Sequence, residues 1–119
     1  AAGNAETRHM IRRRHFALLP RGALFINVAR GGIFDEVELA EELAKGRFVA
    51  CVDVANAEPP PADHPYRSLP NLLFTPHVAG VAAENRLRIG TMAADTVEAF
   101  VQGRPLEFEV TREMLSRIA

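Results

Sequence analysis

The stretch that decides the fold is Ala23-Leu24-Phe25-Ile26-Asn27-Val28-Ala29-Arg30-Gly31-Gly32. A mostly apolar run ends abruptly at an arginine, and two glycines follow it. Nearly continuous apolar runs of this length are typical of strands that helices cover on both faces. In an α/β sheet, ligands bind outside the carboxyl ends of such strands. An arginine there presents a planar fork that suits a carboxylate or a phosphate.

Two further apolar segments, 48–54 and 72–75, are expected to form strands. A helix is expected between the first two strands, because Asp35 suits its N-cap, Glu38 suits the partner position of a capping box, and Gly46 suits a left-handed exit. One apolar stripe of this helix would comprise Leu39, Ala40, Leu43 and Ala44.

A shorter helix is expected at about 12–19 and a long one at about 82–102. Alternating strands and helices indicate an α/β fold with a parallel sheet and right-handed crossovers. The long helix carries apolar residues at helical spacing, and we expect this face to be buried, in part against another domain or subunit. These residues are Ile89, Met92, Ala93, Val97, Phe100 and Val101.

Composition excludes several classes of function. The 119 residues are 48% apolar and 24% charged, as in an ordinary globular domain, and the net charge of −1 argues against nucleic acid or a membrane surface as a partner. No segment approaches the roughly 18 apolar residues of a membrane span. Cys51 is the single cysteine, so disulfides are excluded and a reducing compartment is expected. Histidine spacing favours no metal site.

Polar residues follow the second and third expected strands. Asp53 ends the second and would lie half-buried near the sheet edge, Glu58 follows before three prolines, and Thr75-Pro76-His77 ends the third. Taken singly, each has a plain structural reading: a turn-forming aspartate, a solvated loop acid, a structural histidine and, for Arg30, a surface arginine. Parallel strands end at one edge, however, and histidine is the side chain that exchanges a proton near neutral pH. Together they predict an acid–base site with an anion-binding arginine.

The remaining histidines lack such neighbours in the sequence. His9 and His15 flank the start of the first helix, and His64 lies in the proline-rich loop. We interpret all three as surface or packing residues.

Three ordered motifs resemble the signatures of the D-isomer-specific 2-hydroxyacid dehydrogenases. They are Asn27–Gly32, Val52-Asp53-Val54 with Glu58-Pro59, and Thr75–Gly80. The segment 6–11 is similar to the stretch that precedes them in this family. The similarity extends over nearly all of the chain to about residue 105, and more loosely over 106–110.

The resemblance implies a role for each residue. Arg30 would bind the carboxylate of a small 2-oxo or 2-hydroxy acid, His77 would exchange a proton with the substrate oxygen, and Glu58 would hydrogen-bond and orient His77. Asp53 would hold the carboxamide of the nicotinamide. Val28, Ala29, Arg30, Asp53, His77 and Gly80 would line the cofactor, NAD or NADP.

The resemblance also implies the second half of a Rossmann-type doubly wound parallel sheet, ending in a long helix. The family's Gly-x-Gly-x-x-Gly turn and the acidic residue beyond it are not in this sequence. We therefore expect a partial nucleotide-binding domain over 1–105, and a tail over 106–119 that returns toward a substrate domain outside this chain. A cytoplasmic homodimeric enzyme is expected. The alternative is a truncated, catalytically silent module for dimerisation or interaction.

Overall fold

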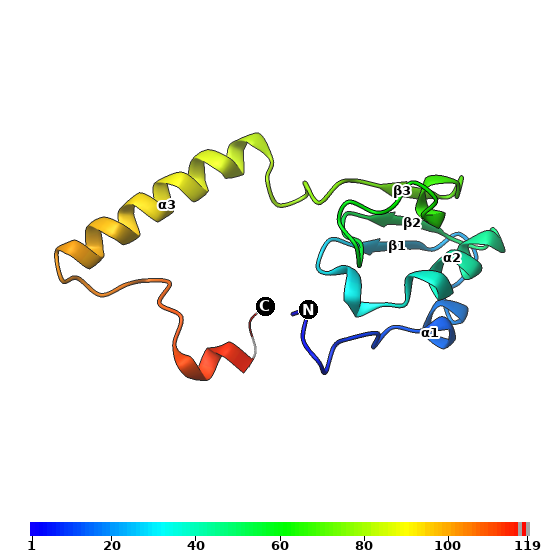
Figure 1. The fold of residues 1–119 in the computed structure, drawn as a ribbon, viewed down its shortest axis with the longest axis horizontal. Helices are drawn as coiled ribbons and strands as arrows, with labels where there is room; N and C mark the ends of the chain where they lie inside the picture. Colours follow the sequence, from blue (N-terminus) through cyan, green and yellow to red (C-terminus); the bar gives the residue numbers. More distant parts are fainter. Residues whose placement is uncertain (117, 119) are drawn as a thin grey trace. The chain divides into compact units, whose positions relative to one another are not determined.

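A computed structural model describes residues 1–116 and 118, which form two compact units, 1–79 and 80–119 (Figure 1). The first unit holds a three-stranded sheet and the helices that cover it. Its elements are α1 (Arg13–Ala17), β1 (Leu24–Asn27), the 3-10 turn η1 (Gly31–Ile33), α2 (Glu36–Ala44), β2 (Val49–Val52), the 3-10 turn η2 (Pro65–Arg67) and β3 (Leu72–Phe74).

The sheet confirms the predicted parallel arrangement. Its strand order is β1-β2-β3, and β2 pairs in parallel with both neighbours. The last registered pairs are Asn27 with Val52 and Val52 with Phe74. All three strands therefore end in one row, and the segments that follow them begin at the same edge of the sheet.

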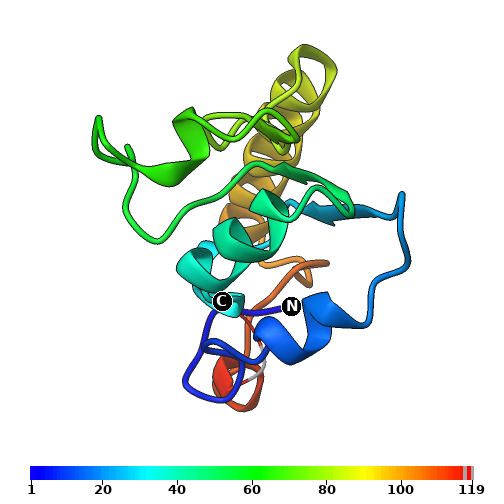
Figure 2. The same ribbon diagram turned by 90° about the vertical axis from the view of Figure 1, so that its right-hand side faces the viewer.

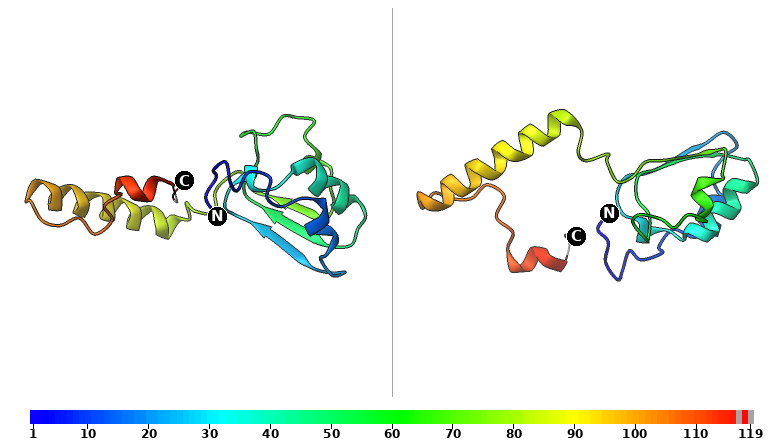
Figure 3. Two further views of the ribbon diagram at one scale, coloured as in Figure 1. Left: turned by 90° about the horizontal axis from the view of Figure 1, so that it is seen from below. Right: turned by 45° about the horizontal axis from the view of Figure 1, so that its top comes forward.

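One face of the sheet carries the core. Helices α1 and α2 lie against this face (Figure 3), where Phe16, Phe34, Leu39 and Leu43 are buried. The Phe16 ring meets the Phe25 ring edge-on, with centroids 5.3 Å apart. Such edge-on aromatic contacts add specific geometry to the burial of apolar area.

Helix α2 begins as predicted but differs from expectation in two details. Asp35 caps it by accepting the backbone N–H groups of Val37 and Glu38. The capping box is wrong, because the Glu38 carboxylate accepts the N–H of Arg13 at the start of α1 instead. Ala44 is exposed and Glu42 is buried in the stripe. The hydrogen bond from Lys45 outweighs the cost of burial, and the pKa of Glu42 lies below its ordinary value.

The other sheet face is open in this unit, contrary to the expectation of helices on both faces. Leu24, Ile26, Val49 and Leu73 point away from the core and are exposed. The reason is that α1, which precedes β1, and α2, which connects β1 to β2, both lie on the same side of the three strands.

The second unit contains α3 (Ala83–Val101), followed by the turn η3 (Arg112–Ser116) (Figure 2). The predicted long helix is confirmed, and Gly103 ends it with a φ of +65°. Its apolar stripe is not buried within this chain: Phe100 is 73% exposed, and Ile89, Val97 and Val101 are also exposed. The expected packing of this stripe on another domain or subunit stays a prediction. Helical periodicity defines a face but does not supply the surface that covers it. Among the described residues, no helix combines the length and hydropathy that a membrane span requires.

Gly31 allows the connection after β1 to pack against the connection after β2. A Cβ at Gly31 would lie 2.3 Å from the carbonyl carbon of Ala55 and 2.7 Å from the nitrogen of Asn56. We expect Gly31→Ala to lower the free energy of unfolding by about 3 kcal/mol, because backbone atoms on both sides must move. Urea unfolding of the chain, followed by circular dichroism, measures this.

Gly32→Ala is the matched control. The Cβ it adds would meet only the Asn56 side chain at 3.6 Å, an ordinary contact, and we expect a change below about 0.5 kcal/mol. Equal losses in the two variants would show that the close approach at Gly31 does not limit packing.

Candidate active site

The three strand ends continue the hydrogen bonding of the sheet into their connecting segments. Asp53 donates its N–H to the carbonyl of Asn27, Thr75 donates to Val52, and His77 donates to Asp53 at 2.8 Å. Backbone hydrogen bonds therefore hold Asp53 and His77 at the sheet edge, in addition to the bonds that their side chains make.

Asn27 shapes the turn that carries Arg30. Its side chain is buried at the end of β1, where Oδ1 accepts the N–H of Ala29 and Nδ2 donates to the carbonyl of Arg30 at 2.9 Å. Sequence reasoning included Asn27 in the motif without assigning this role. Arg30 itself is exposed, and among residues 1–116 and 118 no carboxylate forms an ion pair with its guanidinium.

Asp53 joins the exit of β2 to the exit of β3. It is 3% exposed, hence fully buried rather than half-buried as expected, because it serves as the acceptor for three donors. Thr75 Oγ1 donates at 2.5 Å and the N–H groups of Val78 and Ala79 each at 2.9 Å. Burial disfavours the charged form, but the bonds from Thr75, Ala79 and Val78 outweigh it and lower the pKa of Asp53.

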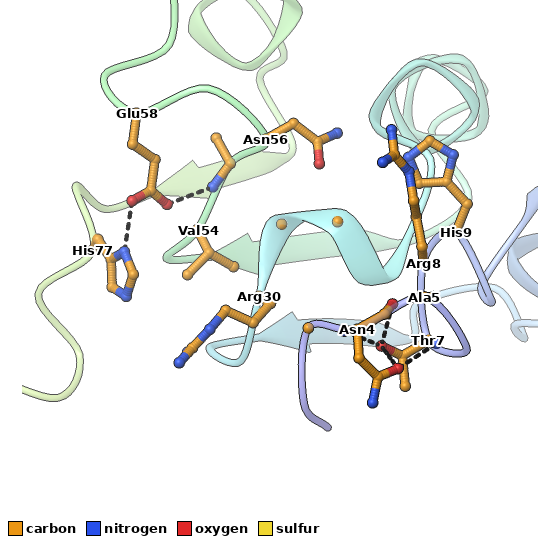
Figure 4. Close-up of a pocket in the computed structure, with 14 residues that line it drawn as sticks. Asn4, Ala5, Thr7, Arg8, His9, Arg30, Val54, Asn56, Glu58 and His77 are labelled. Atoms are coloured by element: carbon orange, nitrogen blue, oxygen red, sulfur yellow. Dashed lines mark hydrogen bonds and ion pairs between the residues drawn. The ribbon is translucent and has the colours of Figure 1, made fainter. Parts of the chain in front are cut away.

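His77 and Glu58 form an ion-pair geometry at this edge. Nδ1 of His77 lies 2.6 Å from Oε2 of Glu58, while Oε1 of Glu58 accepts the N–H of Ala55 at 3.0 Å (Figure 4). The hydrogen bond with His77, assisted by that of Ala55, lowers the pKa of Glu58, so the carboxylate is charged at neutral pH. His77 adopts a φ of +55°, a left-handed conformation that histidine tolerates better than most residues.

Arg30, Glu58 and His77 line one pocket of about 940 Å³ (Figure 4). This volume lies within the range of small-molecule sites. Nε2 of His77 points away from Glu58 (Figure 4), and it is the ring nitrogen left for a ligand. The pocket thus combines a guanidinium without an ion-pair partner with an imidazole held by a carboxylate, a pair of groups that can bind an anion and exchange a proton.

The other predicted cofactor residues do not line this pocket. In the part of the chain that the structure describes, Val28, Ala29 and Asp53 lie at the same sheet edge but outside the pocket lining, and Gly80 begins the second unit.

The N-terminal segment forms one wall of the pocket, which the sequence did not predict. This wall includes Asn4, Thr7, Arg8 and His9. Asn4 Oδ1 accepts the N–H groups of Glu6 and Thr7, a turn that an asparagine before polar residues signals locally. His9, interpreted as a surface or packing residue, lies in this wall and donates its N–H to the carbonyl of Gly32.

Replacing Asp53 with asparagine should destabilise the first unit in a pH-dependent way. The amide loses the charge that three donors stabilise, and we expect a loss of about 2–4 kcal/mol at pH 7. The folded-state pKa of Asp53 is lowered, so its contribution is complete above the ordinary value of 3.8 and declines as pH falls through the folded-state pKa. The difference between the two proteins should therefore shrink below about pH 4.

Urea unfolding at pH 7 and pH 3 measures both effects. Asp63→Asn, a change of an exposed loop acid, is the control and should alter stability by less than about 0.5 kcal/mol. A loss in Asp53→Asn that is the same at both pH values would contradict a charged, hydrogen-bonded Asp53.

Comparison with known proteins gives these motifs a family context. Residues 1–79 match the family described as "D-isomer specific 2-hydroxyacid dehydrogenase, NAD binding domain". The chain is 36% identical over 111 residues to a protein named glyoxylate reductase from Aeropyrum pernix, a match that covers 92% of this chain and 33% of that protein. The chain thus spans about a third of the length of this relative.

Solved structures agree with this match. A D-lactate dehydrogenase with NAD+ from Lactobacillus jensenii superimposes with a TM-score of 0.84 at 26% identity, over 94% of this chain and 38% of that one. A D-isomer specific 2-hydroxyacid dehydrogenase from Xanthobacter autotrophicus in complex with NADPH gives a TM-score of 0.74 at 35% identity, over 91% and 44%. The predicted α/β fold and the expected cofactor class, NAD or NADP, are confirmed. This chain belongs to the NAD-binding domain family of the D-isomer-specific 2-hydroxyacid dehydrogenases.

Proposed function

We propose that the natural protein carrying this chain reduces a small 2-oxo acid to a D-2-hydroxy acid, and that Arg30, Glu58 and His77 form its catalytic edge. The proposal rests on the observation that all three side chains line the same pocket. The chain also spans about a third of its glyoxylate reductase relative, so the activity proposed is that of the intact protein.

The residues at this edge fit a nicotinamide cofactor and an anionic substrate. Gly32 presents backbone without a side chain to the pocket, which permits close approach of a ligand. Asp53 accepts three hydrogen bonds and a carboxylate offers about four acceptor sites, so one site is left for an amide N–H. The cofactor, when bound, would supply the hydride.

The chain's own residues would bind the substrate and move its proton. Arg30 would hold the substrate carboxylate, because its guanidinium lines the pocket without an ion pair among the described side chains. His77 would donate a proton from Nε2 to the carbonyl oxygen as it becomes an alkoxide. Glu58 would keep Nδ1 protonated and directed, and would stabilise the imidazolium before the transfer.

Steady-state kinetics of the intact protein with glyoxylate, hydroxypyruvate and pyruvate test these roles. We expect Arg30→Ala to lower kcat/KM by about a hundredfold, mainly through KM, since substrate binding loses its cation. We expect His77→Asn to lower kcat by about 10²–10⁴-fold, since asparagine tolerates positive φ but transfers no proton. Arg21→Ala, at an exposed turn, is the control. Full activity in either site variant would refute the assignment.

The proposal includes a homodimer in a cytoplasmic setting. Support comes from the exposed apolar side chains of α3, above all Phe100, and from the single cysteine, which suits a reducing compartment. The alternative, a catalytically silent interaction module, would also form dimers but would have no reductase activity.

Sedimentation equilibrium distinguishes these cases. We expect the intact protein to be a dimer, and Phe100→Glu to shift it to a monomer because a charge cannot be buried unpaired at an apolar contact. Leu18→Glu changes an exposed apolar residue of the first unit and should leave the dimer intact. Association without any reductase activity would favour the silent module, and a monomeric wild type would contradict the dimer.

A further inference from the structure

The carboxylate of Glu36 bridges two parts of the β2–β3 connection. Glu36 is the first residue of α2, and its side chain is 11% exposed. Its Oε1 accepts the N–H of Asn56 at 2.8 Å, and its Oε2 lies 3.4 Å from Nε2 of His64. One side chain therefore holds both ends of the segment 56–64.

The His64 end of this bridge is anchored in the core. Nδ1 of His64 accepts the N–H of Tyr66 at 3.3 Å, so the proton of the neutral ring is on Nε2 and points toward Glu36. The His64 ring also packs edge-on against the buried Tyr66 ring, with centroids 4.5 Å apart. Glu36 therefore links α2 to a histidine that is itself held against the buried ring of Tyr66.

The segment between the two ends carries Glu58, and the part around Glu58 has little packing of its own. Asn56, Ala57, Glu58 and Pro59 are all exposed, and Pro60 after them is buried. Arg67 holds the carbonyls of Pro60 and Pro61 at 2.9 and 3.0 Å, but it belongs to the same connection. Among the described hydrogen bonds, those that join this segment to α2 come from Glu36. An exposed segment with few packing contacts opens easily unless such bonds restrain it.

We propose that Glu36 is a positioning residue for the dehydrogenase site, holding segment 56–64 so that Glu58 reaches Nδ1 of His77. The inference rests on the proposed function, in which Glu58 orients His77. Glu36 does not line the described pocket, so it acts through Asn56 and Glu58 rather than on a ligand. A carboxylate in the first turn also stabilises a helix, and the test must separate that general effect from positioning.

Four variants separate the two roles. Glu36→Ala removes both bonds, Glu36→Gln keeps an oxygen that accepts the Asn56 N–H, and Glu41→Gln is the matched control. Glu41 lies in the same helix, is half-exposed and pairs with Arg13, with no described hydrogen bond to segment 56–64. His64→Ala removes the other end of the same bridge and leaves the residues of α2 unchanged.

Hydrogen exchange and kinetics on the intact protein give the readouts. In Glu36→Ala we expect amide exchange over 54–58 to rise by about tenfold, while exchange over 38–44 changes by less than about threefold. We expect kcat to fall about tenfold with KM for the 2-oxo acid nearly unchanged, because Arg30 stays in place. Glu36→Gln should recover kcat to within about threefold of wild type. In carboxyl carbon NMR, the pKa of Glu58 should move up toward its ordinary value in Glu36→Ala but not in Glu41→Gln.

Unchanged exchange over 54–58 in both Glu36→Ala and His64→Ala would overturn the inference, and so would an equal loss of kcat in Glu41→Gln. If Glu36→Ala does not fold, His64→Ala decides: a rise in exchange over 54–58 of about threefold or more supports positioning, and no rise refutes it. A wild-type protein that reduces no 2-oxo acid would instead overturn the proposed function, an outcome that the exchange data distinguish from failure of the bridge.

Discussion

The buried carboxylate of Asp53 is the group on which the arrangement of this sheet edge depends. A buried charge is tolerated only when hydrogen bonds replace its lost hydration. Here the donors are Thr75, Val78 and Ala79, all in the segment after β3. This segment must therefore turn toward the end of β2 for its N–H and hydroxyl groups to reach the carboxylate. His77 lies in this turn with a positive φ, and as a consequence its Nδ1 reaches the carboxylate of Glu58. The geometry of the acid–base pair is thus set by the solvation of a third residue that does not line the pocket.

The parts of the fold that are decided locally could be predicted from the sequence. The apolar runs, the Asp35 cap and the Gly46 exit depend on residues near one another in the chain, and each is found in the structure. That Arg30, Glu58 and His77 lie at the same edge of the sheet follows from the parallel strands, which could be predicted. The N-terminal wall, the Glu38 contact with α1 and the Glu36 bridge could not be predicted, because each depends on which distant backbone amide or segment a side chain meets. What covers the α3 stripe could not be predicted, because helical periodicity defines a face but carries no information about the surface that packs on it.

Gly31 and Ala55 show how small residues serve the site indirectly. A glycine after a strand suggests close approach of a ligand, yet the atoms closest to Gly31 belong to the backbone of Ala55 and Asn56. The contact lets the connection after β2 lie directly on the turn after β1. Since Arg30 precedes Gly31 and Glu58 follows Asn56, this backbone packing determines how near the cation and the acid–base pair can come. Glycine is therefore required here for assembly of the pocket, whatever ligand enters it.

The distribution of charge at the edge also determines which ligand it favours. Two carboxylates lie close to the pocket, and free carboxylates there would repel an anionic substrate. Asp53 is surrounded by three donors, and Glu58 is hydrogen-bonded by His77 and Ala55, so both charges are compensated within the protein. The Arg30 guanidinium donates from Nη1 to the carbonyl of Ala29 at 2.7 Å, but among the described residues no carboxylate forms an ion pair with it. An anion that enters the pocket would therefore meet a cation without a described ion-pair partner on the β1 side and the His77 imidazole on the β3 side. In the proposed reaction, a carboxylate with an adjacent carbonyl would satisfy both groups at once, which a simple carboxylic acid would not.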